Sequence, residues 1–151
     1  MIPIQDDAFA IVTLPAASVN NGSVVCDVID TQGYDYCTIL TILGNMDVAL
    51  TAFNIQESDV KASSTSLTSP DTVPGSDYSV SPATLPTNTS GKNSLYANYI
   101  NMSGRKRYLL PVITVGDGTI GAFVTVVAIL SLGKIAASTN TLKNLAQSLF
   151  S

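Results

Sequence analysis

The 151-residue chain contains no histidine and no tryptophan, and each absence removes a class of function. Histidine is the commonest general base in enzymes and a frequent zinc ligand, so the usual nucleophile–base pairs and zinc sites are excluded. Carbohydrate-binding modules usually offer a platform of Trp and Tyr rings. Tyr96 and Tyr99 fall on opposite faces of one predicted strand, so they cannot share such a platform. Core or interface packing is the better interpretation of these aromatic residues.

Charge is also scarce, because charged residues make up only 12% of the chain against roughly 25% in ordinary soluble proteins. The net charge is −4, from seven basic and eleven acidic side chains, which argues against nucleic acid as a partner. The one basic cluster, 105–107, is either a solvated strand start or a source of salt bridges to a neighbouring subunit. A surface of Ser, Thr, Asn and Ala is typical of proteins packed against neighbours.

Long apolar runs and metal-binding motifs are missing as well. The most apolar stretch, 120–132, is shorter than the roughly 20 residues that cross a bilayer, so we expect no membrane association. The segment 1–7 has neither the basic nor the apolar region of a signal peptide. The two cysteines, Cys26 and Cys37, are either buried free thiols or a disulfide between adjacent strands. We expect no cofactor and no metal.

What is present is β-strand pattern. The predicted strands are 9–14, 24–29, 34–43, 47–57, 95–100, 106–115 and 120–132. Strands 34–43 and 120–132 are apolar on both faces, so we expect them to be covered on both sides. The first strand ends at Pro15 and should lie at a sheet edge, and Pro111 should mark an edge or a bulge. Gly116-Asp117-Gly118 predicts a hairpin turn between strands rather than a phosphate cradle, which would need a helix after it.

Two segments differ from the strands. Residues 58–93 form a long polar loop rich in Ser, Thr and Pro, which we expect to be ordered and held down by apolar anchors. The anchors are Leu67, Val73, Tyr78, Val80 and Leu85. Residues 139–150 predict a short amphipathic helix, whose apolar stripe includes Leu142, Leu145 and Leu149. This helix either closes the end of the domain or docks on a neighbour.

The acidic residues give weak support for catalysis. Glu57 with Asp59 is one carboxylate pair that could serve a glycosidase, but strand-end solvation explains it better. We therefore expect a single non-enzymatic domain over 1–151. Its fold class is all-β, a β-sandwich or jelly roll with a short C-terminal α-helix.

Four runs of this sequence carry a family resemblance. They are Tyr36-Cys-Thr-Ile-Leu-Thr-Ile-Leu-Gly44, Ala52-Phe-Asn-Ile-Gln-Glu-Ser-Asp59, Gly104-Arg-Lys-Arg-Tyr-Leu-Leu-Pro-Val-Ile-Thr-Val-Gly-Asp-Gly118 and Ala128-Ile-Leu130. Together they resemble the head decoration, or cement, proteins that tailed bacteriophages encode beside the major capsid gene. The resemblance covers residues 34–132 without the loop. The long loop and the C-terminal helix depart from the commoner members.

The resemblance implies a structural virion protein on the capsid exterior. Such subunits commonly form homotrimers that bind the major capsid protein, bridge neighbouring capsomers and stabilise the head. The candidate contact elements are the N-terminal arm 1–7, the loop 58–93 and the helix 139–150. The candidate partner-binding residues are Ile2, Ile4, Arg105, Arg107, Leu142, Leu145, Leu149 and Phe150. The alternative function is a glycan- or receptor-binding β-sandwich module of a phage tail or fibre.

Overall fold

The computed structural model describes residues 8–13 and 17–132. The predicted arm 1–7 and helix 139–150 lie outside the described residues. The described part is all-β and contains no helix, and therefore no helix that could cross a membrane. Its strands are β1 (Ala8–Thr13), β2 (Gly22–Ser23), β3 (Ile29–Asp30), β4 (Tyr36–Met46), β5 (Leu50–Ser58), β6 (Lys61–Ser63), β7 (Ser66–Leu67), β8 (Asp71–Thr72), β9 (Ser94–Asn101), β10 (Tyr108–Val115) and β11 (Ala122–Ser131).

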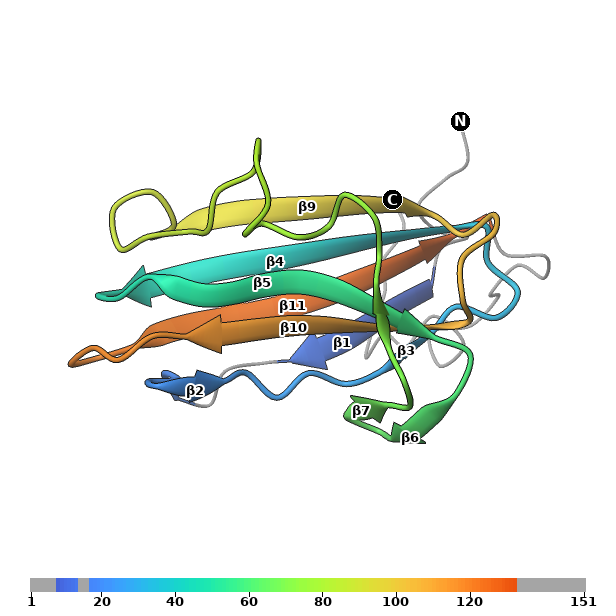
Figure 1. Cartoon of the computed structure of the whole chain (residues 1–151), viewed down its shortest axis with the longest axis horizontal. Coiled ribbons are helices and arrows are strands. Elements are labelled where there is room, and N and C mark those ends of the chain that lie inside the picture. Colours follow the sequence, from blue (N-terminus) through green and yellow to red (C-terminus); the bar gives the residue numbers. More distant parts are fainter. Residues whose placement is uncertain (1–7, 14–16, 133–151) are drawn as a thin grey trace, which may run out of the picture.

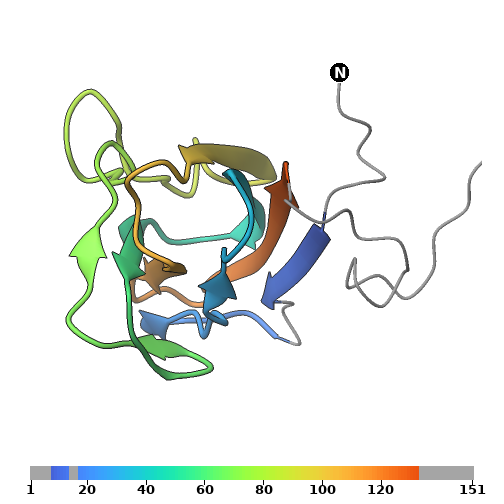
Figure 2. The same cartoon turned by 90° about the vertical axis from the view of Figure 1, so that its right-hand side faces the viewer.

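Two antiparallel sheets face each other across one core (Figures 1 and 2). The first sheet has the strand order β1-β11-β4-β9, and the second has the order β2-β10-β5-β8 with β3 also paired to β10. The inward rows of β4, β5, β10 and β11 are almost fully buried. Both cysteines are among the buried residues, and both are free thiols. The sequence thus predicted the fold class correctly at the level of packed antiparallel sheets.

The chain crosses repeatedly between the two sheets. The chain passes from one sheet to the other between β3 and β4, between β4 and β5, and at each step from β8 to β11. The predicted hairpin at Gly116-Asp117-Gly118 is therefore wrong, because β10 pairs with β5 while β11 pairs with β4 and β1. Gly116, Gly118 and Gly121 have the spacing of a dinucleotide-binding loop, but a strand follows them instead of a helix.

The corner between β10 and β11 is held by side chains from two other corners. The Asp47 carboxylate accepts hydrogen bonds from the backbone N–H groups of Thr119, Ile120 and Gly121 at 2.8–2.9 Å. The Asn20 side chain both donates to the carbonyl of Gly118 and accepts from its N–H group. These bonds satisfy backbone groups that a hairpin would have paired with a neighbouring strand.

β10 has neighbours on both sides, but at Pro111 only β5 pairs with it, so the edge expected at that position is found locally. β10 pairs with β5 throughout, but β2 and β3 meet only its two ends. The backbone carbonyls of Arg107 and Ile113 both accept hydrogen bonds from residues on the β2–β3 side of the strand. The backbone groups of every second residue point to the same side of a strand, so the nitrogen of Pro111 also points to the β2–β3 side. There the chain between β2 and β3 is irregular, and 24–29 is not the continuous strand that the sequence predicted.

The polar segment 58–93 is ordered and carries three short strands that the sequence did not predict, β6, β7 and β8. Val73 is buried, and Leu67, Tyr78 and Leu85 pack against the core, as expected for anchors. Val80 is 60% exposed, so it is not an anchor. The Tyr78 ring stacks on Phe53 at 4.3 Å and meets Tyr96 edge-on. The segment therefore covers one open side of the molecule and seals its aromatic core.

Candidate interaction surface

The outer face of the first sheet is apolar, and no described segment covers it. We define the outer face as the outward side chains of β4, β9 and β11. Its most exposed members are Tyr99 (81%), Leu95 (61%), Ile42 (45%), Tyr36 (43%) and Phe123 (37%). Neither these three strands nor β1 contains a charged residue. Contiguous exposed apolar surface of this kind marks an interaction site in most proteins.

Strand register brings the outer-face residues together. Ile42 lies opposite Leu95, Leu40 opposite Ala97, and Thr38 opposite Tyr99. On the other side of β4, Leu40 lies opposite Val127. Because side chains alternate between the two faces of a strand, the inward row of each strand fills the core while this row points outward. We expected both faces of β4 and β11 to be covered. Within the described residues, only their inward rows of side chains are covered.

The second sheet gives a contrast, because the chain covers part of its outer side. The β6–β7 hairpin folds back over β10, and the backbone N–H of Val28 donates to the carbonyl of Ser64. Leu110 points outward from β10, yet only 9% of it is exposed. No described segment covers the outer face of the first sheet in this way. Among the described residues, the apolar face without a covering segment is therefore a property of the first sheet alone.

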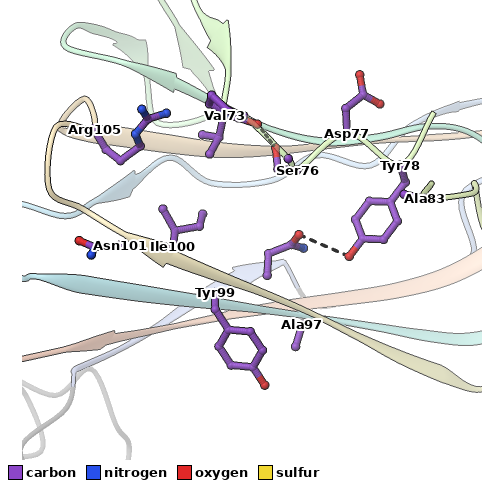
Figure 3. Close-up of a pocket in the computed structure, with 13 residues that line it drawn as sticks. Val73, Ser76, Asp77, Tyr78, Ala83, Ala97, Tyr99, Ile100, Asn101 and Arg105 are labelled. Carbon is purple, nitrogen blue, oxygen red and sulfur yellow. Dashed lines mark hydrogen bonds between the residues drawn. The ribbon is translucent and has the colours of Figure 1, made fainter. Parts of the chain in front are cut away.

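The outer face ends at β9, an edge strand that borders a cavity of about 510 Å³. The cavity lies between β9 and the loop that follows β8, and Val73, Ser76, Tyr78, Asn98 and Ile100 are among its lining residues. In Figure 3, Ile100 points toward the loop, whereas Ala97 and Tyr99 point toward the outer face. The Tyr78 hydroxyl donates to Oδ1 of Asn98 at 3.4 Å, and Nδ2 of Asn98 has no partner among the described residues. Burial raises the pKa of Tyr78 and keeps its hydroxyl a donor.

Arg105 and Arg107 lie at one end of the molecule in ion pairs within the chain. Arg105 contacts Glu57 at 3.2 Å, and Arg107 binds both carboxylate oxygens of Asp30 at 2.6 and 2.8 Å. The Arg107 guanidinium holds the pKa of Asp30 below its usual value, and it also lies over the Tyr108 ring at 4.8 Å. Their partners are thus found in their own chain, and a role in binding a neighbour stays a prediction.

The carboxylate pair considered for catalysis is occupied by structural contacts. Glu57 is buried, and its second oxygen accepts the backbone N–H of Lys106 at 3.1 Å. Asp59 accepts the backbone N–H of Arg107 at 3.3 Å. Within the described residues, no group of three acidic or cysteine side chains is placed to hold a metal ion.

The remaining predicted site residues fall outside the described part of the chain. They are Ile2, Ile4, Leu142, Leu145, Leu149 and Phe150. The residues of the outer face were not singled out by the sequence analysis, although the signal was present in strands that are apolar in both rows. That pattern indicates two buried faces, but it does not say whether the same chain buries both.

The chain was compared with protein-family models, with curated proteins and with solved structures, and none of them matches it.

Proposed function

We propose that this chain is a structural virion protein that binds the outside of an icosahedral phage capsid through the outer face. In this proposal it bridges neighbouring capsomers of the major capsid protein and stabilises the head. The observation that carries the proposal is the uncharged, apolar outer face, which no described segment covers. The resemblance to cement proteins implies that three copies of this chain group at each threefold position of the shell.

The strand orders β1-β11-β4-β9 and β2-β10-β5-β8 support a jelly roll. A jelly roll has eight strands in two sheets, and consecutive strands cross between the sheets. This fold occurs in viral capsid proteins and in lectins. The fold is therefore consistent with a virion protein, but the function depends on the surface that the fold presents.

The energetics suit a protein used in many copies. Full burial of one Leu, Ile or Phe side chain contributes about 1.5–3 kcal/mol, and the outer-face residues are already partly covered. Association also has an entropic cost that offsets much of this gain. A single contact of this size is modest, whereas a subunit that touches two capsomers gains from the high effective concentration of the second site.

The test uses heads of the parent phage prepared without this protein. Addition of the wild-type chain should raise the temperature at which the heads break. Ile42→Lys, which places a charge on the middle strand of the outer face, should reduce binding to the heads at least tenfold and abolish the protection.

Val25→Lys is the matched control, because Val25 is also apolar and 71% exposed but lies beside the second sheet. It should bind and protect like the wild type. Equal loss for both variants, or heads that break at the same temperature with and without the protein, would contradict the proposal.

A glycan-binding module is the second candidate, favoured by the cavity beside β9. Its lining includes Asp77, Asn98 and Asn101, which are residue types that bind sugar hydroxyls. Specific binding on a glycan array, lost in Asn101→Ala and kept in Ile42→Lys, would favour this function over shell binding.

A further inference from the structure

The free edge of β9 is unusual among the sheet edges of the described chain. Natural sheets guard their edges with short strands, charged residues, proline or covering segments. β2, β3 and β8 at the edges of the second sheet have two residues each. At the other edge of the first sheet, the Val12 carbonyl of β1 accepts a hydrogen bond from Asp27. β9 has eight residues, Ser-Leu-Tyr-Ala-Asn-Tyr-Ile-Asn, with no charge and no proline.

Nothing in the described chain pairs with the second side of β9. Among the described residues its ladder partner is β4 alone, and the loop after β8 reaches it through the Tyr78–Asn98 side-chain hydrogen bond, with the cavity beside residues 97–101. Figure 3 shows the side chains of this loop standing across the cavity from β9. An unpaired row of backbone N–H and C=O groups beside an apolar face is a template for another strand.

We propose that β9 pairs with β9 of a second copy of this chain, antiparallel and centred on Ala97. The sequence of β9 is self-complementary in this register. In the outer row, Ala97 would face Ala97 of the second copy, and Leu95 would face Tyr99 of the second copy on each side. Two small residues at the centre, flanked by two aliphatic–aromatic pairs, are a favourable set of cross-strand neighbours.

The inward row fits the same register. Asn98 of one copy lies opposite Tyr96 of the other, which places the Asn98 amide, whose Nδ2 has no partner among the described residues, at the junction between the two copies. A twofold axis perpendicular to the sheet keeps both outer faces on the same side, because it exchanges the strands without turning the sheet over. The pairing thus joins two four-stranded sheets into one continuous sheet with a doubled outer face.

This contact is separate from the proposed contact with the shell. It uses the edge of β9, whereas the shell contact uses the outward side chains of the first sheet. It can be measured on the purified chain without any phage head, so failure of one proposal leaves the other open to its own test.

The test is disulfide crosslinking of the full-length chain with single introduced cysteines. Burial raises the pKa of both Cys26 and Cys37 to about 12, and both are nearly inaccessible, so the native thiols stay unreactive near neutral pH. With mild oxidant, Ala97→Cys should give a covalent dimer, because identical residues at the twofold axis face each other at a distance that a disulfide can span. Thr125→Cys, on the outer face of β11 away from the edge, is the matched control and should give no covalent dimer.

The register gives a second, sharper readout. Leu95→Cys alone and Tyr99→Cys alone should not crosslink, whereas a mixture of the two variants should give the mixed dimer, identified by mass spectrometry of the linked peptides. Ala97→Lys, which places two like charges in direct opposition, should weaken dimerisation at least tenfold in sedimentation experiments while leaving the unfolding transition close to that of the wild type.

Three outcomes would overturn the proposal. The first is a wild-type chain that is monomeric at about 100 μM, which implies a Kd too weak for a specific pairing. The second is crosslinking of Thr125→Cys as efficient as that of Ala97→Cys, which would indicate face-to-face association. The third is self-crosslinking of Tyr99→Cys without the mixed Leu95–Tyr99 product, which would place a different register at the edge.

Discussion

At the scale of single residues, Gly121 is the position with the least tolerance for a side chain. Its φ of +82° lies in the left-handed region, and a Cβ added there would come 2.1 Å from the carbonyl oxygen of Val19. Val19 is also bonded to Ala122 in both directions, at 2.8 and 2.9 Å, so neither backbone can move away without breaking this bridge. The close approach of two backbones is what requires glycine here.

We predict that Gly121→Ala lowers the free energy of unfolding by more than about 4 kcal/mol, because the clash adds to the conformational strain. Gly33→Ala is the control, since Gly33 has a similar φ of +88° with nothing within 4 Å of the added carbon. Strain alone should cost about 1–2 kcal/mol. Urea unfolding measures both, and similar losses for the two variants would show that the Val19 contact does not matter.

Asp47 is a second residue whose role is local and measurable. Three backbone N–H groups at the β10–β11 corner, Ile120 first among them, hold the pKa of its carboxyl below the usual value. A group whose pKa is lowered on folding stabilises the protein above its unfolded pKa of about 4. That stability is lost as the pH falls from about 4 toward the lowered pKa of the folded state.

We predict that Asp47→Asn destabilises the chain at pH 7, because a neutral amide replaces one carboxylate oxygen with a donor that faces N–H groups. The difference from the wild type should shrink as the pH falls below about 4, where the Asp47 carboxyl of the unfolded wild-type chain becomes protonated. Thermal unfolding at pH 7 and pH 3 provides the comparison. A difference that stays constant across this range would mean that the charge of Asp47 is not what holds the corner.

At the scale of elements, the two rows of β11 separate folding from recognition. Val126 is fully buried in the core, and Val127, its neighbour in sequence, lies on the partly exposed outer face. We predict that Val126→Ala lowers the unfolding free energy by about 2 kcal/mol through lost burial and a residual cavity. Val127→Ala should cost less than about 1 kcal/mol.

The second half of this prediction concerns binding. Val127→Ala should weaken binding to phage heads, whereas Val126→Ala should leave head binding intact at temperatures where the variant is folded. Denaturant titration and head binding on the same two variants test it. Equal effects on stability would mean that the outer face is packed as tightly as the core.

At the scale of the whole molecule, the buried core of the described residues runs from Val12 to Leu130. We therefore expect deletion of 139–151 to leave the β-domain folded, with a cooperative unfolding transition. If the predicted helix docks on a neighbour, the deletion should weaken assembly on the head at the same time. A truncated chain without a cooperative transition would instead place these residues in the core. Circular dichroism and head binding of the truncated chain separate the two cases.

The interaction surface shows how far a sequence prediction can go for this molecule. The sequence predicted that β4 and β11 have two apolar faces and that Tyr96 and Tyr99 point in opposite directions. The exposures confirm the second point, since Tyr96 packs in the aromatic core and Tyr99 is 81% exposed. The sequence did not predict which apolar row of side chains no described segment covers. That depends on where the β6–β7 hairpin and the loop after β8 pack against the sheets.

Local pattern therefore determined the longer strands, β1, β4, β5, β9, β10 and β11, and the alternation of their side chains, because these depend on residues close together in the chain. Only the tertiary structure decided which strands pair. Gly116-Asp117-Gly118 correctly indicated that the chain turns, but the turn leads into the opposite sheet, and Asp47 and Asn20 rather than a hairpin ladder satisfy its backbone. Likewise, Arg107 forms an ion pair with Asp30, which is 77 residues away in the chain, and Arg105 forms one with Glu57, which is 48 residues away. Contacts between such distant residues depend on how the sheets pack, and no short stretch of sequence records that arrangement.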